Sequence, residues 1–115
     1  MELEKSLISG SMALLVMKLL QECDMYGYQM IETLEKRSDH TFHLKAGTLY
    51  PLLHGLEAKG LVSAYEREAA AGKKRRYYHL TQEGCAALEE KEASWNQYAR
   101  AVRRVLEGGV CCAGA

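Results

Sequence analysis

A mainly α-helical fold with one small β-hairpin is predicted for this chain of 115 residues. Three observations predict it. Apolar residues recur at helical spacing between residues 12 and 34 and again after residue 46. Two segments rich in β-forming residues, 61–68 and 75–80, flank a short stretch that contains Gly72. A Thr that can cap a helix then precedes a long amphipathic segment.

Length and composition are those of one ordinary globular domain. The chain is 48% hydrophobic and 26% charged, and it is long enough for one core but not for two. No apolar run approaches the roughly 20 residues that span a bilayer. The most apolar stretch, residues 12–20, contains Lys18 and lacks the features of a signal peptide. We therefore expect a cytoplasmic protein that does not associate with a membrane.

The cysteines and histidines form no recognisable catalytic or metal-binding motif. Cys111 and Cys112 are adjacent and lack the two-residue spacer of the common zinc pairs. His40 and His43 would need further ligands from elsewhere to bind a metal, and no histidine lies near a nucleophile motif. The sequence predicts no enzyme, no metal and no cofactor. A redox or metal role for the adjacent cysteines is the less favoured alternative to a loose tail.

The first helix is predicted to run from a cap at Ser9 or Ser11 to Glu22. Apolar residues occupy two of its faces, because Leu14 and Met17 lie beside the main apolar stripe. Burial on two sides indicates that this helix contacts both the core and a second subunit.

The second helix is predicted to cover residues 25–38, with Asp24 as its cap. Tyr26, Met30 and Leu34 form one stripe along it. We expect Tyr26 and Tyr28 to be packing residues rather than ligands. Polar residues 39–45 then make a turn.

The third helix is predicted to cover residues 46–59 and to end at Gly60, in the position where a left-handed residue is favoured. Its leucines lie on one side. The opposite face has no bulky or acidic side chains and consists of Gly47, Pro51, His54, Gly55 and Ala58. Pro51 is tolerated best in the first turn of a helix. Such a bare surface can come very close to another macromolecule.

The tip and return strand of the hairpin carry four consecutive cations, Lys73, Lys74, Arg75 and Arg76. Residues 40–80 contain seven Lys and Arg against three Asp and Glu, although the formal net charge of the chain is zero. A run of charge is usually a solvated surface, but this one follows the bare face of the third helix. Tyr77 and Tyr78 point to opposite faces of the strand. Tyr78 and Leu80 are expected to anchor the hairpin to the core.

Thr81 is expected to cap the last helix. Leu88, Trp95 and Val102 repeat every seven residues in it, with Tyr98 and Val105 between them. An apolar stripe with this period has no partner within so small a domain. The pattern therefore predicts that the chain dimerises through this helix.

Three helices, a hairpin and a long helix match a winged helix-turn-helix with an added dimerisation helix. In this fold the third helix enters the major groove of DNA and the hairpin, or wing, contacts the backbone. We expect a DNA-binding domain over residues 1–80, a dimerisation helix over 81–107 and a flexible tail over 108–115. The alternative is a winged-helix module that uses the same hairpin to bind a protein.

Three segments resemble signature segments of the PadR family of bacterial transcriptional regulators. They read MYGYQM, GTLYPLLHGLEAKGLV and KRRYYHLTQEG, and they follow the family's order and spacing over roughly residues 7–106. The resemblance implies a dimeric repressor that binds a pseudo-palindromic double-stranded DNA operator. His54 stands where many relatives have Lys or Arg, so its role stays open. The residues assigned to DNA binding are Lys45, Thr48, Tyr50, Pro51, His54, Lys73, Lys74, Arg75 and Arg76.

The single last helix resembles the short subgroup of this family. In multidrug-sensing members of the subgroup, a Trp from each subunit stacks on flat aromatic compounds, and the segment ASWNQYA places Trp95 in that context. The acid expected one turn later is Ala99 here. Two interpretations remain open: Trp95 fills the dimer core, or it binds a small effector. An effector site would be lined by Leu7, Ser11, Leu14, Trp95 and Tyr98.

Overall fold

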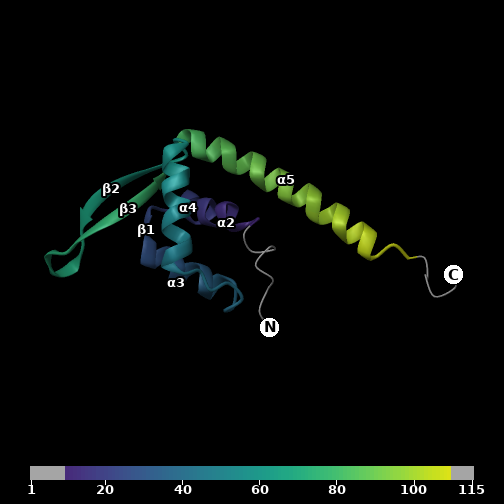
Figure 1. Ribbon diagram of the computed structural model, residues 1–115, viewed down its shortest axis with the longest axis horizontal. Coiled ribbons are helices and arrows are strands. Elements are labelled where there is room, and N and C mark those ends of the chain that lie inside the picture. Colours follow the sequence, from purple (N-terminus) through teal and green to yellow (C-terminus); the bar gives the residue numbers. More distant parts are fainter. Residues whose placement is uncertain (1–9, 110–115) are drawn as a thin grey trace.

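The computed structural model describes residues 10–109. The helices are α2 (Met12–Glu22), α3 (Gly27–Arg37), α4 (Ala46–Ala58) and α5 (Gln82–Leu106), the strands are β1 (Met25–Tyr26), β2 (Val62–Glu68) and β3 (Lys74–Leu80), and a short 3-10 turn, η1 (Ala70–Gly72), joins β2 to β3. The predicted order of three helices, a hairpin and a long helix is confirmed. In Figure 1 the β2–β3 hairpin and α5 extend in opposite directions from a head formed by α2, α3 and α4.

The sheet has three strands in the order β1-β3-β2, one more than the sequence predicted. The prediction that residues 25 and 26 begin the second helix was wrong. They are extended because Met25 pairs with Tyr78 and Tyr26 with Tyr77 in β3. A strand of two residues has no periodicity from which it can be predicted. As a consequence α3 begins at Gly27.

Asp24 is not the cap of α3, because β1 separates it from that helix. Its carboxylate instead accepts a hydrogen bond from the Tyr65 hydroxyl at 2.6 Å and one from His79 Nδ1 at 2.8 Å. The predicted capping role was wrong, and Asp24 holds the strands together.

Three other local features agree with the predictions, and the position of Pro51 does not. Gly60 follows α4 with a φ of 76°, in the left-handed region. The Gly84 N–H donates to Thr81 Oγ1 at 3.0 Å and so caps α5, and Ser11 is the N-cap residue of α2. Pro51 lies in the second turn of α4 rather than the first.

The core lies between α2, α3, α4, the inner face of the sheet and the first turns of α5. Tyr78 and Leu80 are 0% and 5% exposed, which confirms that they anchor β3. Leu88 is fully buried as well, so only the beginning of α5 belongs to this core. The buried side chains are Met12, Val16, Met17, Leu19, Leu20, Met25, Met30, Leu34, Leu44, Leu49, Leu53, Leu56, Val62, Tyr78, Leu80 and Leu88.

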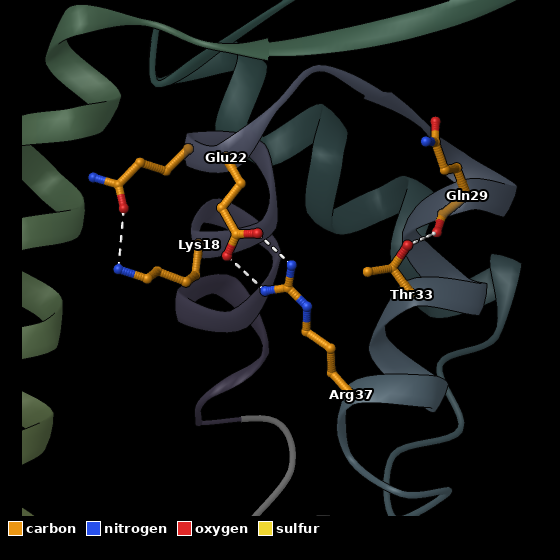
Figure 2. A network of polar contacts seen from close by, with 6 residues as sticks. Lys18, Glu22, Gln29, Thr33 and Arg37 are labelled. Carbon is orange, nitrogen blue, oxygen red and sulfur yellow. Dashed lines mark hydrogen bonds and ion pairs between the residues drawn. The ribbon is translucent and has the colours of Figure 1, made fainter.

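Polar contacts on the surface join α2 to its neighbours (Figure 2). Arg37, the last residue of α3, donates to both carboxylate oxygens of Glu22. The hydrogen bond from Arg37 holds the pKa of Glu22 below its ordinary value of 4.5. On the other side Lys18 Nζ lies 3.6 Å from Glu92 Oε1 in α5. Exposed ion pairs of this kind contribute little stability. The two pairs link α2 to α3 on one side and to α5 on the other.

The second half of α5 leaves the head, and the chain is elongated as a result. The Cα radius of gyration is 17.5 Å, whereas a compact domain of this size has about 13 Å. No residue in this half of the helix is buried. It exposes the large apolar residues Trp95, Tyr98, Val102, Val105 and Leu106. Within residues 10–109 no helix has the length and apolar character needed to cross a membrane.

Candidate nucleic-acid interface

The exposed face of α4 is the one that the helical wheel predicted. Leu49, Leu53 and Leu56 point into the core, so the opposite side of the helix faces outward. All the residues that the sequence assigned to this face are exposed, namely Gly47, Pro51, His54, Gly55 and Ala58. Lys45, Thr48 and Tyr50, which were also assigned to DNA binding, are exposed as well. The face is uncharged apart from the cation at its start.

The four consecutive cations, Lys73, Lys74, Arg75 and Arg76, are all exposed and lie at the beginning of β3. The strand pairing divides them. Arg75 lies opposite Arg67 of β2, whereas its two neighbours in β3 lie opposite Glu68 and Glu66. One face of the wing therefore concentrates positive charge, and the other pairs each cation with an acid. Arg67 was missed from the sequence because its position relative to the cations appears only with the register.

Tyrosines support the two arginines of the positive face. The guanidinium carbon of Arg75 lies 4.3 Å from the ring centroid of Tyr26, and that of Arg67 lies 5.0 Å from the ring centroid of Tyr77. Tyr77 also stacks on Tyr65 at 5.8 Å. Cation–π contacts of this kind restrict the guanidinium groups while leaving their N–H donors accessible. On the other face, Arg76 Nη2 lies 3.4 Å from Glu57 Oε2 and joins the wing to α4.

A cleft of about 300 Å³ lies where α3, α4 and β3 meet, lined by Tyr26, Gly27, Tyr28, Tyr50, Arg75 and Arg76. We call it the tyrosine cleft. None of the described residues that line it is acidic. Tyr28 is 62% exposed, so the expectation that it packs in the core was wrong. The reason is its place in the first turn of α3, off the stripe of buried residues that includes Met30 and Leu34.

A second groove, of about 520 Å³, separates the start of α2 from the middle of α5. It brings together three of the residues predicted to line an effector site, Leu14, Trp95 and Tyr98. Ser11 is not among the described residues that line it, and Leu7 lies outside the described residues. Glu90 and Lys91 also line the groove, so a carboxylate is present although Ala99 supplies none. The Trp95 and Tyr98 ring centroids are 6.2 Å apart.

Two histidines near the start of α4 share one carboxylate. His40 Nδ1 and His43 Nδ1 lie 3.5 Å and 3.1 Å from Glu35 Oε1. Among the side chains of residues 10–109, no set of three His, Cys, Asp or Glu is arranged to hold a metal ion. Cys111 and Cys112 lie outside the described residues.

A helix-turn-helix formed by α3 and α4, a basic β wing and a long terminal helix define a winged-helix DNA-binding regulator. Comparison with known proteins gives the family. Residues 16–90 match the model of the transcriptional regulator PadR-like family, and the chain belongs to that family. Its members are transcriptional regulators rather than enzymes.

Individual relatives agree with this assignment. The chain is 41% identical over 68 residues to the transcriptional regulator Rv3488 of Mycobacterium tuberculosis, a match that covers 59% of this chain and 63% of that protein. The crystal structure of a PadR family regulator from Eggerthella lenta is 36% identical, with a TM-score of 0.76 over 89% of this chain and 87% of that one. A transcriptional regulator from Clostridium thermocellum is 27% identical, with a TM-score of 0.80 over 87% and 97% of the two chains.

Proposed function

We propose that this PadR-like regulator is a homodimeric repressor that binds a pseudo-palindromic operator through α4 and the wing. One observation carries the proposal: Tyr50 of α4 lines one cleft together with Arg75 and Arg76 of the wing, so the two elements meet at the surface. Cations of the wing would neutralise phosphates, and side chains of α4 would meet the edges of the bases. The DNA contacts are assigned to Lys45, Thr48, Tyr50, Pro51, His54, Lys73, Lys74, Arg75 and Arg76.

The dimer is assigned to α5. Its exposed apolar residues have the spacing of a coiled-coil stripe, and Val105 and Leu106 are 80% and 79% exposed. A second copy would cover them. The same symmetry would place two α4 helices on half-sites whose centres are about one helical turn apart, or a multiple of that distance.

The groove beside Trp95 is assigned to a small hydrophobic or aromatic effector. Its wall on α5 carries the exposed residues that would face the second subunit, so a ligand there would contact the dimer interface. An effector would release the DNA only if it favoured one spacing of the two α4 helices over another, a coupling of typically ~1–3 kcal/mol.

The test is selection of duplexes from a random library, followed by titrations at several salt concentrations. We expect a two-fold symmetric site and an affinity that falls linearly in log–log form as salt rises. A chain that binds no duplex at low salt would contradict the proposal and favour the protein-interaction module.

The effector is tested by adding planar aromatic compounds to the complex of protein and DNA. A compound that quenches Trp95 fluorescence without changing the affinity for DNA would refute the release of DNA by an effector.

A further inference from the structure

Gly27 and Tyr50 meet across the tyrosine cleft. A Cβ built on Gly27 would lie 2.8 Å from Cζ of Tyr50 and closer still to its hydroxyl oxygen. Real side chains do not approach one another so closely. The Tyr50 ring of α4 therefore crosses the first residue of α3 in a space that exists only because residue 27 is Gly. The φ of Gly27 is not positive, so the backbone conformation does not require Gly here. The requirement for Gly comes from the lack of space for a side chain.

The same placement puts the Tyr50 ring beside two restrained guanidinium groups. Arg75 is held over Tyr26, and Arg76 is held toward Glu57. Phenol and guanidinium groups donate hydrogen bonds, and none of the described residues that line the cleft has a carboxylate. Glu57, outside the lining, accepts from one nitrogen of Arg76, and a guanidinium group has further N–H donors. Donors arranged in this way around an open space match the oxygens of a phosphodiester.

We propose that the tyrosine cleft holds one backbone phosphate of bound DNA and that Gly27 is the positioning residue that keeps Tyr50 in it. The inference rests on the proposed DNA-binding surface and adds Gly27 and Tyr28 to it. DNA is the source of the phosphate because Tyr50, Arg75 and Arg76 in the lining of the cleft belong to the two elements assigned to DNA, α4 and the wing. Gly27 acts through Tyr50 and does not itself contact the phosphate.

The test begins with Gly27→Ala. The Tyr50 side chain can rotate away more readily than the α3 backbone can shift, and Ala favours a helix more than Gly does. We therefore expect a thermal unfolding midpoint that is no lower than that of the wild type. Gly55→Ala controls for the helix effect on this midpoint alone, since a Cβ on Gly55 meets nothing within 4 Å but Gly55 lies on the face of α4 assigned to DNA.

DNA binding is then measured by fluorescence anisotropy on two unrelated duplexes at several salt concentrations. Gly27→Ala should weaken binding to both by the same factor, at least about tenfold, as expected for loss of a hydrogen bond to a charged group. Its salt slope should not change, because no cation is removed. Arg75→Gln should reduce the salt slope by about one.

The double variant decides whether Gly27 acts through Tyr50. Tyr50→Ala should weaken binding about as much as Gly27→Ala does, and combining the two should add nothing further. Additive losses, wild-type binding by Gly27→Ala, or an unchanged salt slope in Arg75→Gln would each overturn the inference. If Gly27→Ala fails to fold, Tyr50→Phe carries the test, since loss of the hydroxyl alone should weaken binding to both duplexes. Failure of the wild type to bind any duplex would instead contradict the proposed function.

Discussion

His79 Nδ1 lies 2.8 Å from Asp24 Oδ1, although the two residues are 55 positions apart in the sequence. The other carboxylate oxygen of Asp24 accepts a hydrogen bond from the Tyr65 hydroxyl. Asp24 directly precedes β1, and its two partners belong to β3 and β2. One carboxylate therefore joins all three strands. Because Tyr26 of β1 supports the guanidinium of Arg75, this junction also fixes part of the proposed DNA surface.

Asp24→Asn is expected to lower the free energy of unfolding at neutral pH by about 1–2 kcal/mol, through weaker hydrogen bonds to Tyr65 and His79. Partial burial alone would raise the pKa of Asp24, but these two hydrogen bonds, together with the electrostatic attraction of His79 and Arg67, hold it below its ordinary value of 3.8. Folding therefore favours the ionised form of Asp24, and this form stabilises the folded state. Its contribution is complete above pH 3.8 and is lost as the pH falls through the lowered pKa.

Urea unfolding across the acidic range measures this effect. Below pH 3.8 the wild type should lose stability more steeply with falling pH than Asp24→Asn does. Glu22→Gln, which removes the exposed pair with Arg37, is the control, and it should change the stability little. Equal acid sensitivity of the wild type and Asp24→Asn would contradict the role assigned to this carboxylate.

Local features of the fold could be predicted from the sequence, and contacts between distant residues could not. The left-handed conformation of Gly60 and the capping of α5 by Thr81 involve only neighbouring residues, so both follow from residue type and position alone. The partners of Asp24 and Gly27, in contrast, come from other elements. The face of the wing on which Arg67 lies depends on strand register, which no local pattern determines.

Lys73→Gln combined with Lys74→Gln is expected to weaken binding to all duplexes alike, because phosphate contacts carry no sequence information. Each lost contact should reduce the slope of log affinity against log salt by about 0.9. Arg104→Gln removes a cation from the last turn of α5 and should leave the slope unchanged. This helix extends from the head in the direction opposite to the hairpin (Figure 1). A loss confined to the selected operator would show that these lysines do not contact phosphates.

Val105→Asp is expected to convert the dimer to a monomer that keeps its fold. Val105 is 80% exposed in the single chain, so the head does not depend on it. Leu88→Ala in the same helix should instead destabilise the head by about 2–5 kcal/mol, because Leu88 is fully buried. Sedimentation velocity and circular dichroism separate the two effects. Gln97→Asp adds the same charge away from the apolar stripe, and a dimer that survives both Asp substitutions would contradict the assignment of α5.

Glu90→Gln is expected to weaken the binding of planar cations in the groove beside Trp95. The binding of neutral compounds of the same shape should not change. Glu90 lines this groove and supplies the negative charge that Ala99 lacks. Since the groove is open to solvent, the attraction should amount to about 1 kcal/mol, or roughly fivefold in affinity. Lys91→Gln is the matched control because Lys91 lines the same groove with the opposite charge, and it should strengthen the binding of cations. Trp95 is the only tryptophan, so quenching of its fluorescence measures all these affinities. If the ratio of cation to neutral affinity were the same in the wild type and both variants, charge selection by this groove would be disproved.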